Sequence, residues 1–161
     1  MVDDARFEDA GGAPLRLQAL DAEDLKVISA LVQDAVFPMS EMSWQPAKRR
    51  FALLLNRFRW EDRQEAETAH RNYERVQSML VIGDVDKVAT SGLDRSHADL
   101  VLSVLAMEFT PADDGTGRLE ITLAGDGAIA LELECVEIRL SDVTRPYGAP
   151  SKSAPDHALD D

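Results

Sequence analysis

The segment 118–134, RLEITLAGDGAIALELE, limits the possible folds more than any other stretch of the sequence. Apolar and polar residues alternate on both sides of Gly125-Asp126-Gly127. Alternation around a short turn that contains glycine is typical of a β-hairpin. A chain with this hairpin has to build an antiparallel sheet, and its other segments have to fit that sheet.

One long helix is predicted near the N-terminus, after a short strand over 15–20. Asp21 can cap the first turn, with Asp24 three residues later in an arrangement close to a capping box. Apolar residues then recur at the three- and four-residue spacing of an amphipathic helix. These residues are Leu25, Ile28, Leu31, Val32 and Ala35. We expect Pro38 to end the helix, because proline cannot continue one.

Most of the remaining chain is predicted to form strands, joined mainly as hairpins. The segments that show this pattern are 42–45, 50–60, 73–92 with a turn at 83–84, 98–111, the hairpin described above, and 136–140 after a break near Cys135. The segment 50–60 is apolar on both faces and is therefore expected at the centre of the sheet. The fold class is α+β, with a mostly antiparallel sheet that stays open or curls into a half-barrel.

A chain of 161 residues is expected to form one globular domain, here over 15–143. Residues 1–14 are polar and are expected to be a flexible leader, and residues 144–161 are rich in proline and charge and are expected to be a disordered tail. The interior segment 61–72, EDRQEAETAHRN, has no apolar periodicity. It is expected to form an exposed loop or a frayed helical turn.

Charge and composition exclude several classes of function. The formal net charge of −13 repels phosphate backbones, so nucleic acid is not an expected partner, even at the basic turn 48–50. No apolar run approaches the ~18 residues of a membrane span, and the N-terminus lacks the pattern of a signal peptide. The single cysteine, Cys135, excludes an intrachain disulfide. These features favour a cytoplasmic protein.

The sequence contains no nucleophile elbow, phosphate-binding loop or zinc-binding helix, so no metal or cofactor is expected. No pair of histidines has metal-ligand spacing among His70, His97 and His157. Glu132 and Glu134 share one strand face, where solvated carboxylates are more common than a catalytic pair. Cys135 is expected to be a packed and unreactive thiol, because burial and a nearby carboxylate raise the pKa of a thiol.

The best candidate site lies at the end of the segment 50–60. One predicted strand face changes there from leucines to Arg57 and Arg59, while the opposite face stays apolar through Trp60. Arginine binds carboxylates or phosphates with paired hydrogen bonds, and an aromatic ring can stack on the guanidinium or on a ligand. With Asn56 and Gln33 to orient the ligand, these residues would bind a small anion.

A structural role for the same arginines is the alternative. Arg57 and Arg59 would then pair with carboxylates on neighbouring strands, such as Glu132 or Glu41, and Trp60 would close the core. Cross-strand charge pairs of this kind are common in sheets.

Four stretches carry a resemblance to a known family: LQALDAEDLKVISALVQDAV, RRFALLLNRFRWE, SGLDRS and GAIALELECVE. Over nearly all of residues 15–143 the chain resembles an uncharacterised alphaproteobacterial family, domain-of-unknown-function family 2948. The LLLNRFRWE stretch is the most specific part. The resemblance implies a small, stand-alone cytoplasmic protein and no assigned reaction.

Two functions remain open at this point. The first is a non-enzymatic interaction or scaffold module, because extended strands often need a partner to cover an edge, most simply in a homodimer. The second is an anion binder or enzyme that uses a pocket of arginine and tryptophan, formed by Gln33, Asn56, Arg57, Arg59 and Trp60.

Overall fold

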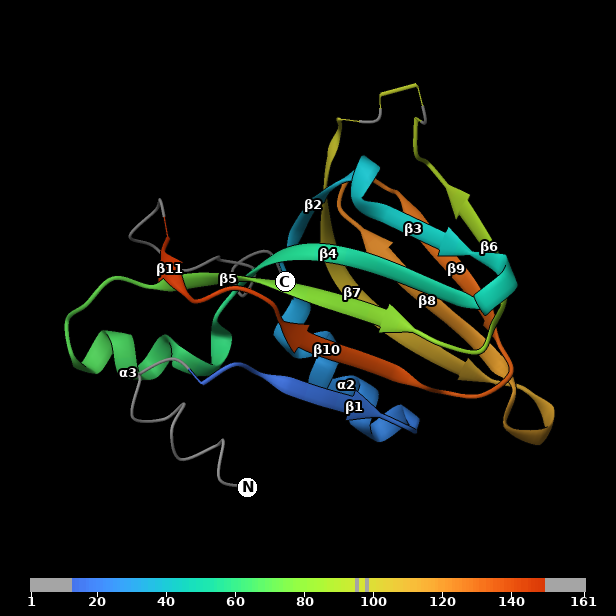
Figure 1. The fold of residues 1–161 in the computed structure, drawn as a ribbon, viewed down its shortest axis with the longest axis horizontal. Coiled ribbons are helices and arrows are strands. Elements are labelled where there is room, and N and C mark those ends of the chain that lie inside the picture. The colour runs from blue at the N-terminus through green and yellow to red at the C-terminus, as the bar shows by residue number, and fades with distance from the viewer. Residues whose placement is uncertain (1–12, 95, 98, 150–161) are drawn as a thin grey trace.

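The computed structural model describes residues 13–149 except 95 and 98 (Figure 1). In chain order, the first half contains β1 (Arg16–Ala19), α2 (Ala22–Val32), β2 (Val36–Pro38), η1 (Met39–Glu41), β3 (Met42–Gln45), η2 (Pro46–Lys48), β4 (Arg50–Phe58), η3 (Trp60–Asp62) and α3 (Arg63–Thr68). The second half contains β5 (Glu74–Ile82), β6 (Val85–Ser91), β7 (Val101–Pro111), η4 (Asp113–Gly115), β8 (Gly117–Leu123), β9 (Ala128–Leu133), β10 (Ile138–Asp142) and β11 (Tyr147–Gly148).

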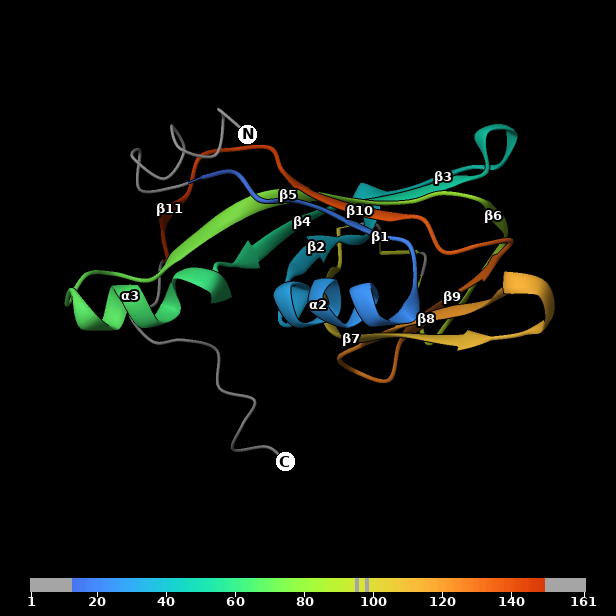
Figure 2. The same ribbon diagram turned by 90° about the horizontal axis from the view of Figure 1, so that it is seen from below.

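In the described part of the chain, all eleven strands belong to one antiparallel sheet. Its order is β1-β10-β5-β4-β2-β7-β8-β9-β6, with β3 added to β4 and β11 added to β5. Figure 2 shows that the sheet curls, with β1, β10, β5 and β4 in one layer and β7, β8 and β9 in the other. The predicted α+β fold is confirmed, and the sheet remains open because β3 and β6 do not pair with each other.

Helix α2 fills the space inside the curl, next to β1, β4 and β7 (Figure 2). Its buried side chains are those of Leu25, Ile28 and Val32, which belong to the predicted stripe. The predicted cap is confirmed, because Asp21 accepts a hydrogen bond of 2.8 Å from the backbone N–H of Asp24. This bond satisfies one of the free N–H groups at the start of the helix.

The helix ends at Val32, so the prediction that Pro38 ends it is wrong. Asp34 takes a left-handed conformation with φ of 66°, which turns the chain towards β2. The backbone N–H of Asp34 then donates to Val104 O, and the N–H of Val104 donates to Ala35 O. Pairing with β7 therefore begins at Asp34, four residues before the proline that was expected to end the helix.

Strand β4 is an interior strand of the sheet, in agreement with the prediction. It pairs with β5 along one edge and with β2 and β3 along the other. Phe51 lies opposite Ile82, and Leu53 lies opposite Leu80, with all four side chains buried in the core. The odd-numbered positions of β4 face α2, and the even-numbered positions face away from it.

Two segments are more ordered than the sequence indicated. The segment 61–72 contains α3, where Ala66 is fully buried, so the predicted exposed loop is wrong and the helical alternative is closer. Tyr147 pairs with Arg75 in β11, inside the stretch expected to be disordered. The break near Cys135 is confirmed between β9 and β10. Residues 1–12 and 150–161 lie outside the described residues, and no finding tests the 15–143 domain boundaries.

Candidate functional site

Arg57 lies on the inner face of β4, in the same row as Leu53 and Leu55, and its side chain is completely buried. Its Nε atom donates to Ser78 Oγ at 3.0 Å, and its NH2 atom donates to Asp142 Oδ1 at 3.0 Å. NH1 and NH2 donate to the two carboxylate oxygens of Glu61 at 2.9 and 2.8 Å. The prediction that this strand face leaves the core is therefore wrong. The guanidinium lies in the protein interior, at a strand position where the pattern of Leu53 and Leu55 would place an apolar side chain.

Arg57 and Glu61 each shift the pKa of the other in the direction that favours the charged form. Burial disfavours the charged form of Glu61, but hydrogen bonds and the charge of Arg57 outweigh it and leave the pKa of Glu61 below its usual value. Burial likewise disfavours the charged Arg57, while Glu61 and Asp142 hold the pKa of Arg57 above its usual value. The single cation of Arg57 thus lies between two carboxylates, those of Glu61 and Asp142.

Arg59 follows β4 and is also buried, with 7% of its side chain exposed. It forms a close ion pair with Glu74, and its NH1 atom lies 3.6 Å from Asp62 Oδ2. Its Nε atom is buried and has no hydrogen-bond partner in the described structure. The predicted structural alternative is right that the arginines pair with carboxylates, but Glu132 and Glu41 are not the partners. The observed partners come from η3, β5 and β10.

Trp60 and Gln33 are brought together, as the anion-site prediction required. The contact uses the backbone, however, since Trp60 Nε1 donates to Gln33 O at 2.9 Å. The ring of Trp60 packs edge-on against Phe58, with centroids 4.7 Å apart. Asn56 lies on the outward-facing side of β4, opposite to Arg57, and its backbone carbonyl accepts from Arg75. No finding tests anion binding by these five residues, and it stays a prediction.

The other titratable candidates lie at the surface. Cys135 is exposed, so its predicted packing is wrong, although Asp84 raises the pKa of its thiol to about 11 through a hydrogen bond. Glu132 and Glu134 are exposed, and Glu134 binds Arg49. His97 contacts Asp94 at 2.9 Å, His70 is exposed, and His157 lies outside the described residues. Within the described ranges, no group of three or more histidine, cysteine or acidic residues is placed to hold a metal ion.

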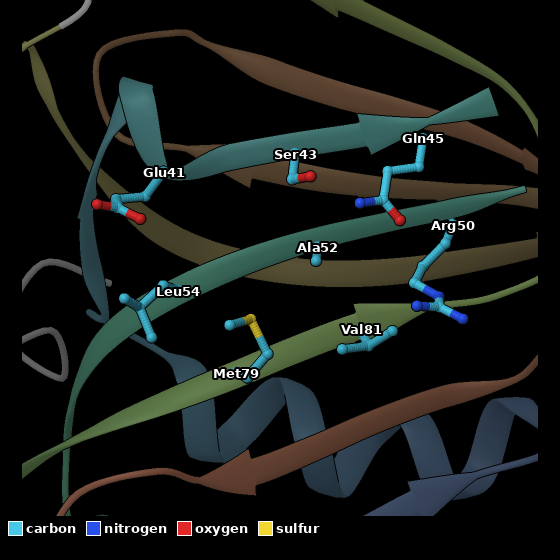
Figure 3. Close-up of a pocket in the computed structure, with 8 residues that line it drawn as sticks. All are labelled: Glu41, Ser43, Gln45, Arg50, Ala52, Leu54, Met79 and Val81. Atoms are coloured by element: carbon cyan, nitrogen blue, oxygen red, sulfur yellow. The ribbon is translucent and has the colours of Figure 1, made fainter. Parts of the chain in front are cut away.

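A shallow hollow that the sequence analysis missed lies on the outer face, which we define as the side of β3, β4, β5, β10 and β1 that points away from α2. Figure 3 shows its side chains projecting from β3, β4 and β5, with α2 behind the sheet. Its volume is ≈ 350 Å³. The lining residues are Glu41, Ser43, Gln45, Arg50, Ala52, Leu54, Met79 and Val81. The apolar even-numbered positions of β4 were the sequence signal for this surface.

A second hollow lies in the seam, which we define as the gap between β3 and β6. Its volume is ≈ 390 Å³. It is lined by Met39, Ser40, Met42, Trp44, Phe51, Val88 and Thr90. Five of these seven side chains are apolar, and they belong to the core or pack against it. The hollow of the seam thus lies directly against the edge of the core.

A family model described as "Protein of unknown function (DUF2948)" matches residues 15–157. The chain belongs to the DUF2948 family. No curated protein and no solved structure matches it. The predicted family is confirmed and its function is unknown, whereas the alphaproteobacterial origin stays a prediction.

The DUF2948 chain was expected to lack a membrane span. Among its described residues, none of the helices combines the length and the apolar character needed to cross a bilayer.

Proposed function

We propose that this DUF2948 protein is a non-enzymatic interaction module of the cytoplasm, which binds an extended segment of a partner protein in the seam. One observation carries the proposal: two strand edges that pair with nothing in the described structure face each other across an apolar hollow. Extended peptides commonly bind by adding a strand to such an edge.

The apolar side chains of the seam would gain burial from a bound strand. Met42, Trp44 and Val88 pack against the core, yet each remains partly exposed. Side chains of an extended segment alternate between two faces, so every second one would point into the hollow. Covering such side chains contributes about 25 cal/mol for each Å² of apolar surface removed from water.

The backbone of the seam is suited to the same occupant. At one end β6 is joined to the turn between β3 and β4, because the N–H of Val85 donates to Arg49 O at 2.9 Å. Beyond this contact β3 pairs only with β4, and β6 pairs only with β9. Unpaired strand edges of this kind are a template for another strand. The partner is either a second copy of this chain, as a homodimer, or a different protein.

Photo-crosslinking in cells tests this function. A photoreactive phenylalanine analogue at Trp44 should form a covalent adduct with another protein, while the same analogue at the exposed Glu120 should form none. An adduct of twice the mass of the chain identifies a homodimer, and any other mass identifies a different partner. Adding Val88→Lys should abolish the adduct by placing a charge in the seam. An adduct that persists with Val88→Lys, or no adduct from position 44, contradicts the proposal.

The anion-binding alternative is supported by the Nε atom of Arg59, a buried donor without a hydrogen-bond partner in the described structure, although Glu61 Oε2 lies 3.7 Å from it. Thermal unfolding of the purified chain with a panel of carboxylate and phosphate metabolites tests it. A metabolite that raises the melting temperature of the wild type but not that of Arg59→Lys would support a site there. Equal shifts in both chains, or none, would contradict it.

A further inference from the structure

We propose a second binding surface: the outer face binds an acidic segment of a partner protein, with its carboxylates on Arg16, Arg50 and Arg139 and its apolar side chains between them. This surface lies on the side of the sheet that faces away from α2. It is independent of the seam, so either proposal can fail without the other.

The centre of the outer face is apolar. The register places Ala52 opposite Val81 and Leu54 opposite Met79 across β4 and β5, and all four side chains are partly exposed. In Figure 3 these four side chains lie together on the side of the sheet that points away from α2. An apolar patch on a sheet face that is otherwise polar is a common feature of protein interaction sites.

The patch lies in a trough rather than on a flat surface. The hollow of Figure 3 is continued by a second one of ≈ 400 Å³, which shares Arg50, Met79 and Val81 with it. The second hollow reaches β10, where Arg139 lies opposite Val81. The trough therefore crosses β3, β4, β5 and β10, which gives room for several residues of a bound segment.

The arginines of this face are available for a partner. The side chains of Arg16 and Arg50 form no ion pair or hydrogen bond with any residue that the structure describes. Arg139 has only Glu137 nearby, at 3.7 Å, and the two side chains are 60% and 40% exposed. Exposed pairs of that kind are weak, so Arg139 can exchange its partner at little cost. Arg16 lies on the same face, since β1 places it opposite Ser141.

Charge complementarity identifies the occupant as an acidic protein segment. Arginine binds carboxylates with paired hydrogen bonds, and the apolar centre requires apolar side chains that a nucleic acid lacks. Glu41 and Glu137 line the two hollows, so only carboxylates that are spaced to reach the arginines are favoured, and a continuous polyanion is repelled, as it also is by the net charge of −13. Two copies meeting face to face would place arginines against arginines, which disfavours self-association here.

Selection from a library of random 12-residue peptides on the immobilised Val88→Lys chain, in which the seam is blocked, tests this proposal. Enriched peptides should carry Asp or Glu interleaved with apolar residues. Their Kd, measured by fluorescence anisotropy, should rise at least tenfold with Arg50→Glu/Arg139→Glu and should also rise with salt. Arg118→Glu is the matched control, because it reverses an exposed charge on β8, and it should leave the Kd unchanged.

The same measurements can overturn the proposal. Enriched peptides without acidic residues, or a Kd that the double variant does not change, would exclude the outer face. Binding of a 20-nucleotide DNA or of phosphatidylserine vesicles that the double variant abolishes would assign the face to another partner class. Loss of self-association in the double variant, seen by sedimentation, would assign it to a second copy. The wild type and Val88→Lys should bind the selected peptides equally, which separates this surface from the seam.

Discussion

The two ends of β4 carry arginines with opposite environments. Arg50, at the start, is exposed and unpaired in the described structure, whereas Arg57, near the end, is completely buried and bound to three side chains. Their separation of seven positions decides the difference, because an odd separation places the two side chains on opposite faces of a strand. Strand phase, and not residue type, determines which arginine is structural and which one is available to a partner.

Among the variants that test this comparison, Arg57→Ala has the largest expected effect on stability. The substitution leaves Asp142 buried without its cationic partner, and we expect the free energy of unfolding to fall by about 3–5 kcal/mol in urea denaturation. A second variant, Arg57→Met/Asp142→Asn, removes both charges and should recover part of the loss. If Arg57→Ala keeps the stability of the wild type but loses binding of a carboxylate or phosphate metabolite, the arginine is a ligand-binding residue and the comparison fails.

Glu61→Gln should remove part of the same cluster and flatten its pH dependence. At pH 7 the loss should be about 1.5 kcal/mol, because hydrogen bonds to a charged acceptor are replaced by weaker ones. The folded pKa of Glu61 lies below its usual value of 4.5. Its contribution to stability is therefore complete above that value and is lost as the pH falls below it, towards the folded pKa.

Urea denaturation of both chains between pH 7 and pH 3 measures this effect. The stability difference between wild type and Glu61→Gln should shrink as the medium becomes acidic. A difference that stays constant over this range would show that Glu61 is not held charged by Arg57.

Trp60→Phe tests the packing beside the buried arginines. It keeps an aromatic ring but removes the Nε1–H donor to Gln33 O, and we expect a loss of about 1 kcal/mol in urea denaturation. Trp44→Phe is the matched control, since Trp44 makes no side-chain hydrogen bond with a described residue. Equal losses in the two variants would show that the hydrogen bond contributes nothing.

Arg50→Ala should have the smallest effect on stability, within about 0.5 kcal/mol of the wild type, because an exposed side chain without partners is removed. Urea denaturation under the conditions used for Arg57→Ala gives the direct comparison. A loss as large as that of Arg57→Ala would mean that Arg50 contributes to the folded chain itself, and the contrast between the two strand ends would disappear.

Much of the fold was predictable because it depends on local patterns. The hairpin around Asp126 and the cap at Asp21 follow from turn and capping chemistry alone. The end of α2 was not predictable in this way, because Asp34 is turned by pairing with Val104 on β7, seventy residues further along the chain. A rule that considers only proline and its sequence neighbours cannot predict that contact.

The candidate site shows the same limit. The sequence singled out Arg57 and Arg59 correctly as unusual residues at the end of a core strand. Their partners could not be identified, because Asp142 and Glu74 lie on strands whose register no local pattern sets. Arg57 shares a strand face with Leu53 and Leu55, which face the core. The burial of its side chain could therefore have been predicted from the sequence.

The position of Asp142 in the chain has a consequence for synthesis. This carboxylate on β10 accepts hydrogen bonds from the backbone N–H of Leu15 and from Arg57, 127 and 85 residues earlier in the chain. At translation rates of about 5–20 residues per second, Asp142 is synthesised roughly 4–17 s after Arg57. Until β10 has been translated, Arg57 therefore has only the nearby Glu61 as its carboxylate partner from this cluster, and the cluster is completed only after that point.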